Sequence, residues 1–196
     1  ARIGLIWDSR DRETGPTSGT WSEVLVQYVP SALGAEGSYA RLTLTDRRYF
    51  TVVPRLVFAH RFLVQNVGDG APAHELFLVQ NSFKQQEGLG GAKTVRGVLK
   101  NRFVGRGMVV WNAELRWRAV DFSAFGRSFH TVLSAFVDQG RVWEEGVDVG
   151  ELFSDLHRGV GAGVRLGMGE NFVVSLDLAT SDETGLPMYI GLGYLY

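Results

Sequence analysis

The sequence predicts an all-β chain that forms an antiparallel transmembrane β-barrel. Two observations support this prediction. Apolar and polar residues alternate along many short segments. The composition combines 25 glycines with 12% aromatic residues, which is typical of barrels built from short strands and tight turns. Because 196 residues are enough for one domain with a sizeable core, we expect a single barrel domain over residues 1–196.

The first four expected strands alternate weakly. They cover Arg2–Asp8, Thr20–Pro30, Ser38–Arg48 and Val53–Asn66. The fifth, Met108–Asp121, alternates most clearly. Apolar residues occupy its odd positions and polar residues its even positions, namely Val109, Trp111, Ala113, Leu115 and Trp117 against Asn112, Glu114, Arg116 and Arg118. A strand has this pattern when one face meets hydrocarbon and the other meets a polar space.

Four more strands bring the number visible in this chain to about nine. They cover Phe129–Val142, His157–Met168, Asn171–Thr180 and Met188–Tyr196, and each repeats the alternation. In a membrane barrel the apolar face points to lipid and the polar face lines a lumen. A soluble sandwich or lipocalin-like barrel would instead pack the apolar face inside, which leaves the glycines on the opposite face of His157–Met168 unexplained. We therefore favour the membrane barrel.

A long connection at about residues 67–106 interrupts this series, with a possible short helix or strand at 75–81. Connections of this length inside a compact domain are usually functional or disordered. Near its end the run Gly90–Gly97 places Arg96 among small residues. This arginine is the charged group in the loop that most needs an explanation.

Two carboxylates on the polar faces of the following strands are candidate partners for this arginine. They are Glu114 and Asp138. A guanidinium that leaves water can bridge two carboxylates through charge-assisted hydrogen bonds. We therefore expect the loop to enter the lumen and to be locked there through Arg96. The alternative is a solvated Arg96, with Asp138 satisfied by Arg116 or Arg118.

Composition and motif spacing argue against several other classes of protein. A net charge of −1 gives no bulk attraction for nucleic acid, and the absence of cysteine excludes disulfides. The four histidines, His60, His74, His130 and His157, lack the spacing of metal ligands. We find no catalytic constellation, so we expect no enzyme activity, no metal and no cofactor.

Four motifs follow one another along nearly the whole chain. They are Asp8–Asp11 followed by Gly15, Pro16 and Gly19; Gly90–Gly91 followed by Val95–Gly97; Asn112–Arg116; and Phe136–Trp143. In this order they resemble the BamA/TamA-type outer-membrane assembly factors, the bacterial surface-antigen superfamily. One departure is Val98, where the family usually has an aromatic residue.

The resemblance implies the C-terminal portion of a sixteen-stranded barrel in the bacterial outer membrane. It implies a membrane protein insertase or polypeptide translocase, and it assigns Arg96 the same lumen-locking role, so that the expected lock consists of Arg96, Gly97, Glu114 and Asp138. The implied partners are outer-membrane lipids and unfolded outer-membrane client proteins, with accessory lipoproteins as further candidates.

The expected strand number also suggests an incomplete barrel. An eight-stranded barrel is just filled by its own side chains, so it cannot hold a loop of this length. Bacterial single-chain barrels also have even strand numbers. We therefore expect further strands before Ala1, or another chain that completes the barrel.

Small residues mark two further candidate sites. Gly159, Gly161 and Gly163 are either a seat for the inserted loop or a device that bends the strand. At the C-terminus, Gly191, Gly193, Tyr194 and Tyr196 resemble the signal by which outer-membrane barrels are recognised for insertion, and the glycines are consistent with a weak seam. Ordinary strand glycines are the alternative.

Two other functions remain open at this point. The barrel could anchor a passenger domain such as a lipase, or it could be a small passive pore. The sequence upstream of Ala1 distinguishes the first of these from an insertase, because assembly factors of this family carry periplasmic repeat modules.

Overall fold

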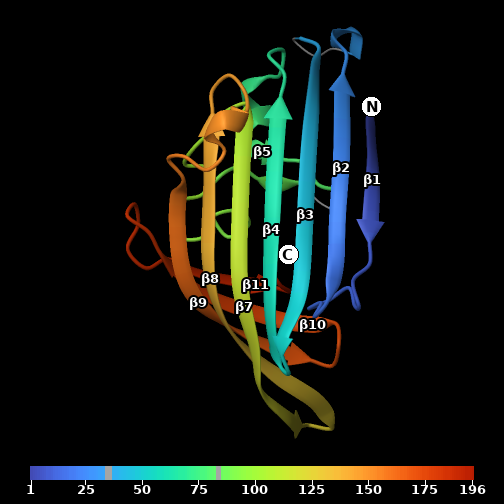
Figure 1. Cartoon of the computed structure of the whole chain (residues 1–196), viewed down its shortest axis with the longest axis vertical. Helices are drawn as coiled ribbons and strands as arrows, with labels where there is room; N and C mark the ends of the chain where they lie inside the picture. Colours follow the sequence, from blue (N-terminus) through green and yellow to red (C-terminus); the bar gives the residue numbers. More distant parts are fainter. Residues whose placement is uncertain (34–36, 83–84) are drawn as a thin grey trace.

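The computed structural model of the chain describes residues 1–33, 37–82 and 85–196. Nine strands form one antiparallel sheet in the order β1-β2-β3-β4-β7-β8-β9-β10-β11, so each strand pairs with the next long strand along the chain (Figure 1). Their bounds are Arg2–Asp8, Gly19–Val29, Tyr39–Val53, Leu56–Val67, Gly107–Ala124, Arg127–Trp143, His157–Met168, Phe172–Thr180 and Met188–Leu192. The predicted antiparallel barrel architecture is confirmed.

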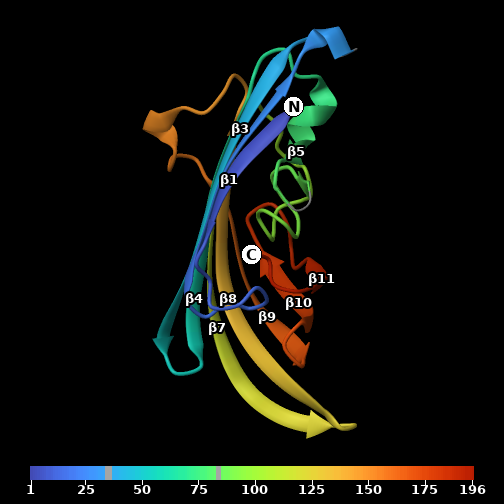
Figure 2. The same ribbon diagram turned by 90° about the vertical axis from the view of Figure 1, so that its right-hand side faces the viewer.

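The sheet is open, with β1 and β11 at its two edges. Figure 2 shows that it curves, so that β10 and β11 turn toward the side that carries the segment between β4 and β7. That segment contains the 3-10 helix η2 (Ala73–Phe77) and a small hairpin of β5 (Leu78–Val79) and β6 (Gln86–Glu87). Two other 3-10 helices, η1 (Ser31–Leu33) and η3 (Val149–Glu151), lie in connections. No helix among the described residues is long and apolar enough to cross a membrane.

The two faces of the sheet follow the alternation in the sequence. On β7, Leu115 and Trp117 are 45% and 51% exposed, whereas Asn112 and Glu114 are buried. On β9, Val164 and Leu166 are likewise exposed and Arg165 is buried between them. The apolar side chains therefore point outward, where lipid would cover them, and the polar side chains point toward the concave side. This concave side is the lumen.

The register places six lumen-facing residues in one row across the sheet. Each is directly opposite the next, in the order Trp21, Arg47, Arg61, Asn112, Asp138 and Gly159. Because side chains on one face of neighbouring strands interact, this row brings polar groups from separate sequence segments together. It forms the floor on which the long connection lies.

Several predicted strand boundaries are wrong, and the third and fourth strands show this most clearly. The third strand does not stop at Arg48 but continues to Val53, and the fourth begins only at Leu56. In the structure Asp46 and Arg48 pair with each other at 2.8 Å, so the strand carries these charges without ending. The tight turn follows instead at Arg55, which has a positive φ of 71°.

The last strand is also shorter than predicted, because β11 ends at Leu192 rather than at Tyr196. Gly193 has a φ of 79°, a left-handed conformation that glycine adopts without steric cost. The chain turns there, and Tyr196 becomes buried against Tyr49 and Ala59 on the lumen side. The predicted alternation therefore fails after Leu192.

Candidate functional site

The long connection lies inside the curve of the sheet, between Val67 at the end of β4 and Gly107 at the start of β7. Residues 83–84 of the predicted loop lie outside the described residues. Its apolar side chains pack on the inner faces of β4 and β7. The buried cluster consists of Leu63, Val79, Leu89, Val95, Val98, Met108 and Val110. Val98 therefore fills a position in this cluster without an aromatic ring.

The tip of the loop is a narrow turn that requires glycine. The Gly91 N–H donates to the Val98 carbonyl at 2.9 Å, which brings the two arms together. Gly90 and Gly97 have φ values of 99° and 96°, a region that L side chains rarely adopt. A Cβ atom at Gly90 would also lie 1.9 Å from the Leu99 carbonyl oxygen. These glycines let the chain reverse close to the sheet.

Arg96 is completely buried, and its main partner is Asp138 of β8. The Asp138 carboxylate accepts from Arg96 Nε at 2.7 Å and from Arg96 Nη2 at 3.1 Å. It also accepts from the Arg96 backbone N–H at 3.1 Å and from the Asn112 side chain at 2.7 Å. The bidentate geometry is the strong form of an arginine–carboxylate pair.

Two other carboxylates complete the surroundings of this guanidinium. Arg96 Nη1 donates to Glu114 of β7 at 3.2 Å and to Asp177 of β10 at 3.0 Å. The guanidinium carbon also lies 3.3 Å from the centre of the Phe136 ring, which is cation–π geometry. One loop residue thus contacts three strands of the sheet.

Two further arginines balance the charge of this cluster. Arg116 pairs with Glu114 at 2.9 Å, and Arg165 pairs with Asp177. Three arginines therefore face three carboxylates, which avoids an uncompensated buried charge. Burial disfavours the charged form of Arg96, but the attraction of Asp138, and of Glu114 and Asp177 after it, outweighs burial and raises its pKa above the ordinary value.

A second set of contacts holds the loop just before Arg96. Arg61 of β4 donates to the Lys93 carbonyl at 2.7 Å and to the Asn112 side chain at 2.9 Å. Asn112 in turn donates to the Thr94 carbonyl at 2.6 Å. The loop backbone is therefore held by β4 through Arg61 and by β7 through Asn112.

The three glycines of β9 have different neighbours. A Cβ atom at Gly159 would lie 1.7 Å from the Arg96 carbonyl oxygen, so the loop backbone rests directly on this glycine. A Cβ at Gly161 would meet the Phe136 ring, and one at Gly163 would meet the Asp177 and Arg165 side chains. Gly159 is the one of these three that touches the loop.

The C-terminal residues lie inside the curve. Tyr194 and Tyr196 place their rings 4.5 Å and 5.2 Å from the Arg116 guanidinium carbon. The Tyr196 hydroxyl donates to the Ala59 carbonyl at 3.1 Å. Gly191 remains in β11, opposite Ser175.

Sequence reasoning missed several residues of the cluster. Asp177, Arg165, Asn112 and Phe136 all contact Arg96 or one of its partners. The alternation along each strand could have identified them, because each occupies a lumen-facing position of its strand. Arg118, which sequence reasoning considered as a partner of Asp138, pairs with Asp121 at 2.6 Å.

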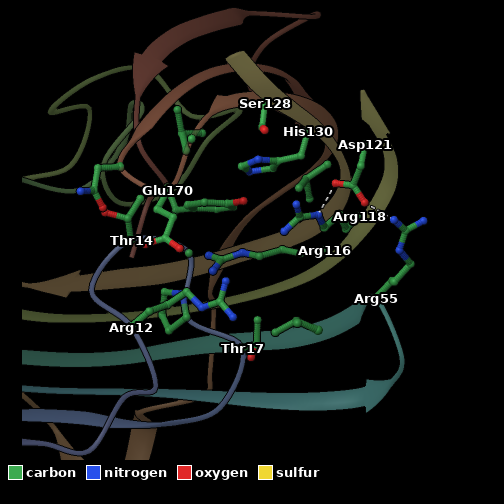
Figure 3. A pocket seen from close by; sticks show the side chains of 18 of the residues that line it. Arg12, Thr14, Thr17, Arg55, Arg116, Arg118, Asp121, Ser128, His130 and Glu170 are labelled. Atoms are coloured by element: carbon green, nitrogen blue, oxygen red, sulfur yellow. Dashed lines mark hydrogen bonds and ion pairs between the residues drawn. The ribbon is translucent and has the colours of Figure 1, made fainter. Parts of the chain in front are cut away.

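A large pocket of about 1180 Å³ lies at the end of the lumen away from the ends of β4 and β7 that the long connection joins. It is bounded by the turns at 9–18, 54–55 and 169–171 and by the β7–β8 hairpin. Figure 3 shows Arg12, Arg116, Arg118 and Asp121 around it. Its lining carries charges of both signs: four arginines at 12, 55, 116 and 118, and four acids at 11, 13, 121 and 170. The pocket is a polar mouth without a single dominant charge.

The connection between β1 and β2 forms part of this mouth, and Asp11 holds it. The Asp11 carboxylate accepts from the backbone N–H groups of Thr17 and Ser18 at 2.8 Å and 3.2 Å and from the Thr17 hydroxyl at 2.6 Å. Burial raises the pKa of Asp11, but these hydrogen bonds outweigh it and lower the pKa to about 2.

We expect acid to loosen this connection. Because the pKa of Asp11 falls from 3.8 to about 2 on folding, the stabilisation is present above pH 3.8 and is lost as the pH falls through 2. Solvent screening leaves it at roughly 1 kcal/mol. A nitroxide on Glu13→Cys, in a chain that lacks cysteine, should become more mobile on acidification. In an Asp11→Asn background the nitroxide should be equally mobile at every pH. A nitroxide that still becomes more mobile on acidification in that background would contradict the role assigned to Asp11.

The curved sheet with lipid-facing apolar side chains, and a long loop anchored inside it by a buried arginine, define a portion of a transmembrane β-barrel with a lumen loop. The family model of the Omp85 superfamily domain matches residues 1–194. The chain therefore belongs to the Omp85 superfamily, and it is a bacterial outer-membrane protein. This confirms the predicted relationship to the BamA/TamA-type barrels.

The solved structures give the same result for the fold. BamA from Haemophilus ducreyi, in a form lacking POTRA domains 1–3, superposes with a TM-score of 0.67 at 16% sequence identity. The match covers 98% of this chain and 40% of that chain. The sequence has no match among curated proteins. At this identity the structural likeness establishes the fold alone, as the C-terminal portion of a larger barrel.

Proposed function

We propose that this chain is the loop-bearing part of a barrel that inserts outer-membrane proteins or moves polypeptides across that membrane. Membership of the Omp85 superfamily supports the general class. The observation that carries the proposal is the loop held inside the lumen through Arg96, which is fully buried among Asp138, Glu114 and Asp177.

The proposed mechanism gives the loop a structural task. A buried arginine with three carboxylates costs much desolvation and is poorly explained by stability alone. It does fix one geometry, because Arg96 joins β7, β8 and β10 at one point. The loop would therefore hold the C-terminal strands in a defined curvature while β11 offers an unpaired edge to a client strand.

Client recognition would proceed by strand addition. β11 is the last strand that this chain contributes to the sheet, and a strand whose outer edge becomes unpaired can pair with an extended segment. The lipid-facing side chains of this strand, Met188, Ile190 and Leu192, are 59–72% exposed. A client strand with an apolar outward face would continue this surface. Unfolded outer-membrane proteins have such strands.

The polar pocket at the turn end of the lumen supports an entry route. Its mixed charges favour a hydrated mouth over a tight binding site for one ligand. We place unfolded client polypeptides and lipids among the proposed partners, together with accessory proteins at this mouth.

The test is client folding in liposomes. The full native protein that contains this chain should accelerate the folding of a small urea-unfolded outer-membrane barrel relative to empty liposomes. Asp138→Asn should reduce that acceleration, because Arg96 loses the charge of its main partner. The matched control is Asp148→Asn, in the outer connection beside η3.

Two outcomes would contradict the proposal. Folding at the empty-liposome rate would favour an anchor for a passenger domain. Steady ion conductance without any effect on client folding would favour a passive pore.

A further inference from the structure

The residue after the buried arginine has its own set of partners, and all of them come from the last hairpin. The Gly97 N–H donates to the Tyr189 hydroxyl of β11 at 3.0 Å. The Gly97 carbonyl accepts from the Ser181 hydroxyl at 2.7 Å and from the Thr184 hydroxyl. Both polar groups of Gly97 are thus satisfied by side chains from one segment, residues 181–189.

The hairpin is shaped to receive this peptide. The Ser181 hydroxyl accepts from the backbone N–H groups of Glu183 and Thr184 at 3.1 Å and 3.2 Å, which fixes the loop before β11. A Cβ atom at Gly97 would lie 2.8 Å from the Thr180 carbonyl oxygen. The two backbones therefore approach so closely that only glycine fits at this position.

The receiving strand has little other support. β11 has five residues, and within the described residues it pairs with β10. Short strands with few buried side chains are among the first elements to open locally. Each hydrogen bond from the loop therefore contributes a larger share of the stability of β11 than it would in a central strand.

We propose that Tyr189, Ser181 and Thr184 are positioning residues that tie the C-terminal edge strand to the inserted loop. Arg96 and Gly97 are consecutive, so the loop cannot leave the carboxylate cluster without also leaving the hairpin. Insertion of the loop therefore holds β11 in place, and withdrawal of the loop releases it. The biological consequence of this tie rests on the proposed function: the loop would control whether β11 is available to pair with a client strand.

Hydrogen exchange of the full native protein in lipid nanodiscs tests the coupling without any client. Tyr189→Phe should accelerate exchange of the β11 amides about 3- to 10-fold, the change expected for loss of one hydrogen bond. Exchange in β7 and β8 should stay unchanged. The matched control is Tyr28→Phe, a half-exposed tyrosine on β2, which should leave β11 unaffected.

A second variant and a double-mutant cycle complete the test. Ser181→Ala combined with Thr184→Val removes the two hydroxyls that donate to the Gly97 carbonyl. This double variant should accelerate exchange of the β11 amides as Tyr189→Phe does. Arg96→Ala should also accelerate exchange of the β11 amides. In that background Tyr189→Phe should cause no further acceleration, because the two sites are coupled and coupling is reciprocal. Additive effects, unchanged β11 exchange in both hairpin variants, or equal acceleration throughout the sheet would overturn the inference. These readouts need no client, so they are separate from failure of the proposed function.

Discussion

Arg96→Ala is expected to release the loop from the lumen and to abolish most client folding activity. Removing one partner of a buried ion pair typically costs about 3–5 kcal/mol because the remaining charge is left uncompensated. Here Asp138 loses its guanidinium, and Glu114 and Asp177 keep Arg116 and Arg165. We therefore expect the lower end of that range, about 3 kcal/mol. This corresponds to more than a hundredfold shift toward the released loop.

Limited proteolysis measures this release. In the native protein the run Gly88–Val98 is largely buried, so cleavage there should be slow; in Arg96→Ala it should be fast. The control is Arg102→Ala, because Arg102 is an exposed arginine of the same connection and surface substitutions usually change stability by less than about 0.5 kcal/mol. A slow cleavage rate in Arg96→Ala would show that the apolar cluster around Leu89 and Val95 holds the loop without the ion pairs.

A charge swap between positions 96 and 138 is a poor test of the pair. An aspartate at position 96 would lie beside the carboxylates of Glu114 and Asp177. An arginine at position 138 would lie next to Asn112, which already holds the Arg61 guanidinium. The reversed pair would therefore meet repulsion from both neighbours. Failure of the swap to restore stability is expected even though Arg96 and Asp138 are bonded.

The alternation in the sequence was enough to predict the sheet and its orientation. Period-two patterns identify which face of each strand is apolar, and for β7 this assigned Asn112 and Glu114 to the lumen correctly. Turns were harder to place. The third strand was predicted to end at Arg48, but it continues to Val53 with Asp46 and Arg48 paired on it. Similarly, the pattern gave no sign that Gly193 turns the chain inward.

The contacts of the site were predictable only in part, although the residues and the resemblance assigned the same role to Arg96. Glu114 and Asp138 could be chosen because both are carboxylates on lumen-facing positions. Asp177 satisfies the same criterion, yet which carboxylate meets the loop depends on sheet curvature, which sequence does not give. The contacts of Gly97 with Tyr189 depend on the turn between β10 and β11 and left no sequence signal.

Gly159→Ala is expected to have the second largest effect, because this position touches the loop backbone. A Cβ atom there would lie 1.7 Å from the Arg96 carbonyl oxygen, and a backbone atom cannot rotate away as a side chain could. The loop or β9 must shift by more than an ångström, which would lengthen the Arg96–Asp138 contacts. Overpacking of this kind typically costs about 1–3 kcal/mol.

The measurement is again protease access to residues 88–98, compared with Gly185→Ala, where a Cβ atom meets no atom within 4 Å. We expect faster cleavage in Gly159→Ala and no change in Gly185→Ala. In an Arg96→Ala background the loop is already released, so Gly159→Ala should add little. If it still accelerates cleavage by the full factor, the glycine serves the curvature of β9 and not the seating of the loop. The two explanations of this glycine therefore predict different double-mutant results.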